Sequence, residues 1–77
     1  MEIKDFIQNF ADQFDDTDAS VFTPETVFHE LDEYSSLIAL SIIAMIDEEY
    51  GVTIGANEMK ASVTIQDLFN QVQVKVE

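Results

Sequence analysis

The first regular pattern along the chain is an apolar repeat at helical spacing close to the N-terminus. Apolar residues recur there at positions i, i+3, i+4, i+7 and i+11, which places their side chains on one face of a helix. The members of this repeat are Ile3, Phe6, Ile7, Phe10 and Phe14. The pattern predicts an amphipathic helix over about residues 2–14, and the turn-forming residues 15–20 end it.

The next segment, up to residue 35, has no sustained helical or strand period and predicts a long loop. Within it, Thr23, Pro24 and Glu25 predict a short helical turn, because Thr is a good N-cap, Pro fits the first helical position and an acid suits the first turn. Five apolar residues are expected to fix the loop to the core. They are Val21, Phe22, Val27, Phe28 and Leu31.

A second long helix is predicted from about Ser36 to Tyr50, with Gly51 as its C-terminal stop. Residues 52–54 have strand-like composition, but the sequence offers no second run to pair with them, so we expect an extended linker. Residues 56–61 predict a short third helix with Asn57 near its N-cap.

The last predicted helix begins at Thr64 and Asp67, which have the spacing of a capping box with Asp in place of Glu or Gln. Its apolar face consists of Ile65, Leu68, Phe69 and Val72, and residues 73–77 are expected to form a frayed tail. Together the patterns predict an all-α fold: a small bundle of three main helices plus a short helix, with a long loop between the first two main helices. The length of 77 residues predicts one domain over residues 1–77.

The helix predicted over residues 36–50 is apolar on almost every side. On a helical wheel, Ser41, Asp47 and Glu48 face water, and the opposite side is a core face of Ala39, Ile42, Ile43, Ile46 and Tyr50. Leu37, Leu40 and Ala44 lie between the water-facing residues. Exposed apolar residues with charged neighbours favour a docking surface. The alternative is that the long loop folds over this face and buries it.

Ser36 lies on the same side, at the start of this helix. One explanation is that it is the N-cap, whose hydroxyl accepts a hydrogen bond from a free backbone N–H. The other is that the hydroxyl is exposed for modification. A phosphate ester in this place would be favoured by the free N–H groups and by the helix dipole.

The charge of the chain narrows the class of its partners. Its net charge is -13, with only three lysines and no arginine, so nucleic acids and anionic membrane surfaces would repel it. Proteins with basic patches are the expected partners. No apolar run approaches the ~20 residues of a membrane span, and acids interrupt the N-terminal apolar pattern, which does not fit a signal peptide. We expect a cytoplasmic monomer.

Few residues are suited to catalysis or to metal binding. The chain has no cysteine and one histidine, so neither disulfides nor structural zinc are expected, and His29 is predicted to be a surface loop residue. A calcium-binding loop starting at Asp16 fails, because Val21 stands at its required Gly and Val27 at its Glu. Met45 and Met59 are expected to be packing residues. With no metal site and no acid–base or nucleophile arrangement, we do not expect an enzyme.

Four short motifs follow one another along the chain: Ser35-Ser36-Leu37, Asp47-Glu48-Glu49-Tyr50-Gly51, Val52-Thr53-Ile54 and Thr64-Ile65-Gln66-Asp67. In this order and spacing the chain resembles the acyl carrier proteins over nearly its whole length. In that family the serine of a D-S-L motif opens the second helix, and acids, an aromatic residue and Gly close it. Ser35 stands where the family usually has Asp, and Glu33 where it commonly has Gly.

The resemblance implies an acyl-carrier-like bundle in which Ser36 bears 4′-phosphopantetheine, attached from coenzyme A by a separate magnesium-dependent phosphopantetheinyl transferase. The thiol of that arm would hold acyl groups as thioesters, so no cysteine is needed. Further partners would be acyl-transferring and condensing enzymes with basic patches, in fatty-acid or polyketide-type biosynthesis or a specialised pathway. The residues expected to meet these partners are Leu37, Leu40, Ala44, Asp47, Glu48 and Glu58. For the three acids, a solvated acidic face is the alternative.

Helix spacing and the resemblance together predict that the acyl chain is shielded between helices. The candidate lining residues are Ile42, Ile46, Ile54, Leu68 and Phe69, for which simple core packing is a compatible alternative. A different function also accounts for the exposed helix face. In it, the chain is an unmodified acidic helical module that binds a basic partner through Leu37, Leu40, Ala44, Asp47 and Glu48.

Overall fold

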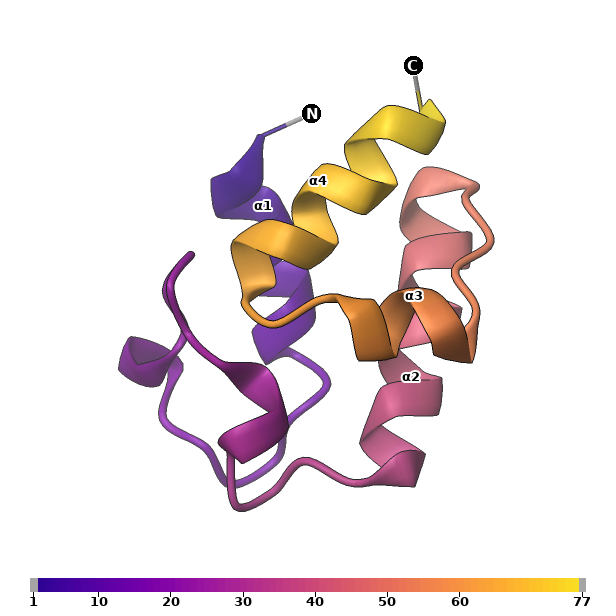
Figure 1. The fold of residues 1–77 in the computed structure, drawn as a ribbon. Helices are drawn as coiled ribbons and strands as arrows, with labels where there is room; N and C mark the ends of the chain where they lie inside the picture. Colours follow the sequence, from indigo (N-terminus) through magenta and orange to yellow (C-terminus); the bar gives the residue numbers. More distant parts are fainter. Residues whose placement is uncertain (1, 77) are drawn as a thin grey trace.

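The computed structural model describes residues 2–76, and the fold in this range is all-α (Figure 1). The helices are α1 (Ile3–Ala11), α2 (Ser36–Tyr50), α3 (Ala56–Ala61) and α4 (Ile65–Val76). The loop between α1 and α2 contains two short 3-10 helices, η1 (Ala19–Val21) and η2 (Phe28–Glu30). The predicted bundle, its short third helix and its long loop are therefore confirmed.

Aromatic side chains from three parts of the chain build the core. Phe6 of α1 packs against Phe69 of α4 with ring centroids 5.5 Å apart, and Phe10 packs against Phe28 of the loop at 5.4 Å. Phe6, Phe10 and Phe28 have no exposed surface. These contacts explain how a chain of this length closes a core around a long loop, because each aromatic side chain buries a large apolar area.

The apolar faces predicted from helical spacing are confirmed in α1 and α4. In α1, Phe6 and Phe10 are buried, as is Phe14 just beyond its end, while Ile3 and Ile7 are half-buried. All four predicted residues of α4 are buried: Ile65, Leu68, Phe69 and Val72. Met45 and Met59 are packing residues, as predicted. In the loop, Phe22 and Phe28 are buried, but Val21 is 41% exposed, so its predicted anchoring role was wrong.

Backbone hydrogen bonds join the long loop to the start of α4. Val27 and Thr64 form an isolated antiparallel bridge, and the N–H of Ile65 donates to the carbonyl of Thr26 at 3.1 Å. The short turn predicted at Pro24 is present as a single turn, closed by the N–H of Thr26 on the carbonyl of Thr23, and it does not continue into a helix. The Oγ1 of Thr26 also accepts from the N–H of Thr23, and this local bonding replaces helical bonding.

The predicted C-terminal ends of α1 and α4 differ from the observed ones, and the predicted start of α3 agrees with the structure. Helix α1 stops at Ala11, and Phe14 reaches the core from a turn beyond it. Gly55 is the N-cap of α3 and Asn57 lies two residues after it, near the N-cap as predicted; the carboxylate of Glu58 accepts a hydrogen bond from the N–H of Gly55 at 3.2 Å. The predicted frayed tail is helical through Val76, and residue 77 lies outside the described range.

Two helix signals in the second half of the chain are confirmed. Gly51 ends α2 in the left-handed conformation, with φ 66°, which favours glycine. The capping box of α4 is complete, since Thr64 Oγ1 accepts from the N–H of Asp67 and Asp67 Oδ2 accepts from the N–H of Thr64, both at 3.1 Å. Residues 52–54 form the extended linker that was expected.

Glu33 fixes the segment that leads into α2. Its carboxylate accepts hydrogen bonds from the backbone N–H groups of Asp15 and Asp16 at 2.7 and 3.0 Å, and from the hydroxyl of Thr17 at 2.7 Å. The Thr17 hydroxyl contributes most to lowering the pKa of Glu33 below its ordinary value, with smaller contributions from the backbone donors. The two ends of the loop are thus joined three residues before Ser36.

Candidate functional site: the start of α2 and the groove beside it

The start of α2 is organised by Ser35, not by Ser36. Ser35 has the extended backbone of an N-cap, with φ -153° and ψ 175°, and its Oγ accepts a hydrogen bond from the N–H of Ile38 at 3.3 Å. The helix then begins at Ser36. The explanation of Ser36 as the N-cap was therefore wrong by one residue, because the neighbouring serine has that role.

The Ser36 side chain is exposed in the first turn of α2. Within residues 2–76, its hydroxyl makes no hydrogen bond to another protein group. The first turn also contains no acid. The site thus consists of a free primary hydroxyl at the positive end of a helix, which favours an attached or approaching phosphate.

A groove runs from Ser36 along the side of α2 that faces α3, in the region where Figure 1 shows α3 beside α2. Its volume is about 400 Å³, within the usual range for small-molecule sites. Its lining consists of His29, Tyr34, Ser36, Ala39, Leu40, Ile43, Ala56, Met59 and Lys60. The groove is therefore apolar along its length, with polar groups contributed by the preceding loop, by Ser36 and by α3.

The wheel did not predict this groove, because it placed Ala39 and Ile43 on the core face of α2. Both are half-buried, packed against the core and also bordering the groove. The contributions of Tyr34 and Lys60 depend on how the loop and α3 lie against α2, which no local pattern in the sequence reports. Burial raises the pKa of Tyr34 above its ordinary value of 10.0, so its hydroxyl is a neutral hydrogen-bond donor at neutral pH.

The five residues predicted to line an acyl cavity are all buried in the core cluster. Their exposures are 0% for Ile42, 0% for Ile46, 1% for Ile54, 0% for Leu68 and 6% for Phe69. None of them lines the groove. The groove instead lies on the next face of α2, so a chain placed in it would contact these five residues only after the core had moved.

The face of α2 that was expected to meet partners is open to solvent. Leu37 is 76% and Leu40 is 62% exposed, and Ala44, Asp47 and Glu48 are exposed as well. The alternative in which the long loop folds over this face was therefore wrong. Leu40 also borders the groove, so the exposed apolar strip and the groove share an edge.

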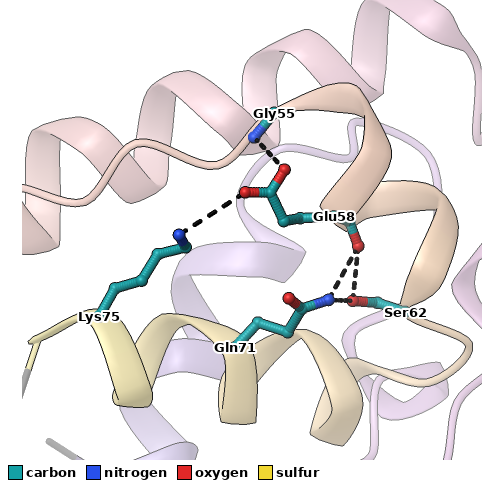
Figure 2. A network of polar contacts seen from close by, with 5 residues as sticks. All are labelled: Gly55, Glu58, Ser62, Gln71 and Lys75. Carbon is teal, nitrogen blue, oxygen red and sulfur yellow. Dashed lines mark hydrogen bonds and ion pairs between the residues drawn. The ribbon is translucent and has the colours of Figure 1, made fainter.

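Glu58 belongs to a polar network that joins α3 to α4 (Figure 2). Its carboxylate caps Gly55 and pairs with Lys75 of α4 at 3.6 Å. Below it, Nε2 of Gln71 donates to the carbonyl of Glu58 and to the hydroxyl of Ser62, at 3.1 and 2.9 Å. The carboxylate of Glu58 is therefore already engaged by Gly55 and Lys75, and it contributes to the packing of α3 against α4.

One of three comparisons with known proteins found a match. The family model described as "Phosphopantetheine attachment site" matches residues 5–72, and the chain belongs to this family. Domains of this family are non-catalytic carriers with covalently attached 4′-phosphopantetheine, and they work with a transferase and with biosynthetic enzymes. Neither the search of curated proteins nor that of solved structures found a match.

The residues at the start of α2 fit this prosthetic group. A free hydroxyl is needed for the phosphate ester, and Ser36 has one at a helix N-terminus. An elongated, largely apolar groove begins at the same residue. No helix of residues 2–76 has the length and apolar character needed to cross a membrane.

Proposed function

We propose that the chain is an acyl carrier protein that bears its 4′-phosphopantetheine on Ser36 and presents acyl groups to fatty-acid or polyketide-type biosynthetic enzymes, either general ones or those of a specialised pathway. The observation that supports this most is the division of roles between two adjacent serines. Ser35 caps the helix, and the hydroxyl of Ser36 stays exposed and unbonded within the described range. The cysteine-free composition fits the cytoplasmic location that we expect.

In the attachment step, Oγ of Ser36 forms a bond to the pantetheine-side phosphorus of coenzyme A. The pyrophosphate bond breaks, adenosine 3′,5′-bisphosphate leaves, and the hydroxyl proton passes to a base of the transferase or to water. When bound, the arm supplies a thiol on which acyl groups are held as thioesters. The protein contributes by fixing the attachment point. Ser35 holds the first turn of α2, and Glu33 holds the segment before it.

Partners would bind the exposed side of α2. Leu37, Leu40 and Ala44 offer an apolar strip beside Ser36, and Asp47 and Glu48 follow on the same helix. A basic patch on the partner would pair with the two acids, mainly raising the association rate and setting the orientation. Tethering then raises the effective concentration of the acyl group at the docked enzyme. Glu58 could join this surface only by leaving its contacts with Gly55 and Lys75.

Loading the purified protein tests the proposal. We incubate it with coenzyme A, Mg²⁺ and a broad-specificity phosphopantetheinyl transferase, and measure its intact mass. The proposal predicts a gain of one phosphopantetheine, which is lost in Ser36→Ala and kept in Ser35→Ala. If several transferases give no gain with the folded protein, the chain is instead an unmodified acidic interaction module.

A further inference from the structure

The groove beside Ser36 differs in charge from the rest of the molecule. The chain has 16 acidic residues, but none of those within residues 2–76 lines the groove. One of the three lysines and the single histidine do line it, together with the hydroxyls of Tyr34 and Ser36. All four polar side chains can donate a hydrogen bond, and none is an anion. In a protein of net charge -13, this local composition favours an anionic acceptor.

Lys60 is the only lysine among the four polar residues that line the groove. It lies one turn after Ala56 on the same side of α3, and both residues border the groove. Within residues 2–76, the ammonium of Lys60 forms no ion pair, whereas Lys75 is paired with Glu58 on the α4 side of the same short helix (Figure 2). The two sides of α3 thus differ: on one side the lysine is paired within the fold, and on the other the exposed Lys60 borders the groove without an ion pair in the described range.

We propose that Lys60 holds an anionic oxygen group of the molecule attached at Ser36, with the donors of Tyr34 and His29 bordering the same space. This inference rests on the proposed carrier function. The shared chemistry has two possible sources: the phosphodiester of the arm, or a carboxylate on the acyl cargo. Lys60 is exposed, so solvent and salt screen this pair and low ionic strength favours its detection.

A purely apolar role for Lys60 is the competing explanation. A lysine can lay its methylene stem along an apolar surface and keep its ammonium in water. This explanation predicts that the ammonium does not respond to any anion at the groove. The two explanations therefore differ in a property that can be measured directly at the side chain.

The experiment compares four forms of the full chain by NMR at low ionic strength, where charge interactions are weakly screened. The forms are unmodified, carrying the arm with a free thiol, carrying a hexanoyl group, and carrying an adipyl group. Hexanoyl and adipyl have the same number of carbons and differ by a terminal carboxylate. Intact mass verifies each form. The three lysines give three sets of Cε–Hε and ammonium signals, and Lys60→Gln identifies the set of Lys60.

The proposal predicts a shift of the Lys60 signals, with those of exposed Lys4 on α1 unchanged as the internal control. A shift already present with the free-thiol arm assigns the phosphodiester as the anion. A shift that appears only with adipyl assigns the cargo carboxylate. If the Lys60 signals stay unchanged in all forms, or move equally with hexanoyl and adipyl but not with the arm, the proposal is overturned and the carrier function stands. If the protein cannot be loaded with the arm, both the role of Lys60 and the proposed carrier function are overturned.

Discussion

The Oγ of Ser35 accepts a hydrogen bond from the backbone N–H of Ile38 at 3.3 Å, and this contact leaves Ser36 as the first residue inside α2. An N-cap side chain satisfies one of the unpaired donors of the first turn. The family usually has Asp at the position of Ser35, and both residue types can make this contact. The exchange thus preserves the local structure that presents Ser36 while removing a negative charge beside it.

Replacing Ser35 tests this relationship. Ser35→Ala should lower the free energy of unfolding by about 0.5–2 kcal/mol, the usual cost of losing an N-cap, and Ser35→Asp should restore it. Ser36→Ala is the matched control and should change stability by less than about 0.5 kcal/mol, since its exposed hydroxyl makes no hydrogen bond in the described range. Urea unfolding measures all three. Equal losses for Ser35→Ala and Ser36→Ala would contradict the division of roles.

A charged substitution in the exposed apolar strip on α2 should weaken recognition by the transferase without destabilising the fold. Leu37→Asp should leave the free energy of unfolding within about 0.5 kcal/mol of the native value, because Leu37 is 76% exposed. It should lower kcat/KM for arm transfer by about tenfold or more if Leu37 is a central contact of the docked transferase. Val74→Asp on α4, at a site 74% exposed, should leave transfer unchanged. Equal effects of the two changes would argue against docking through α2.

Glu33 makes the loop sensitive to acid. The pKa of Glu33 is lowered from its ordinary value of 4.5, mainly by the Thr17 hydroxyl. The folded state therefore binds protons less readily than the unfolded state, and the stabilisation by Glu33 is present above pH 4.5 and is lost as the pH falls through the lower pKa of the folded protein. Asp18 and Asp67, whose pKa values are also lowered from 3.8, act in the same direction.

Glu33→Gln should lower stability at neutral pH and reduce the further loss on acidification, as followed by urea midpoints at a series of pH values. Glu25→Gln removes an exposed acid of the same loop that forms no side-chain hydrogen bond within the described residues, and it serves as the control. If the two variants have the same pH profile, Glu33 does not hold the loop through its ionised form.

The polar network between α3 and α4 predicts that Gln71 stabilises α3, the short helix that lines one side of the groove. Gln71→Ala removes two hydrogen bonds, to the Glu58 carbonyl and the Ser62 hydroxyl, and should cost about 1–3 kcal/mol. Amides of α3 should exchange with solvent faster relative to those of α1. Gln73→Ala in the same helix is the control, because Gln73 makes no side-chain hydrogen bond within residues 2–76. Unchanged exchange in α3 would show that the network does not hold it.

Local periodicity predicted which segments are helical, because apolar faces such as Ile65, Leu68 and Val72 are a direct consequence of packing against a core. The sequence alone could not show which of two neighbouring residues is the N-cap of a helix. Which of Ser35 and Ser36 caps α2 depends on the extended backbone of Ser35, which no local pattern in the sequence reports. The same holds for Gly55, which becomes the N-cap of α3 through the side chain of Glu58.

Sequence reasoning placed Ser36 at the start of the second helix and Leu37 and Leu40 on an exposed face, and the structure agrees with both placements. A helical wheel gives the direction of a side chain and not the packing density around it, so it could not distinguish a cavity lined by Ile42 and Ile46 from the filled core that they form. The groove depends on how α3 lies against α2. Lys60 and Ala56 border it for that reason, and their sequence context contains no signal of it.

Ser36, and not Ser35, is the proposed attachment point, and fragmentation of the loaded native protein distinguishes the two serines. Tandem mass spectrometry of the peptide containing both serines can place the phosphopantetheine between them. Attachment at Ser36 predicts backbone fragments that assign the added mass to Ser36 alone. Fragments that assign it to Ser35 would contradict the division of roles, because the residue that caps α2 would then be the one that carries the arm.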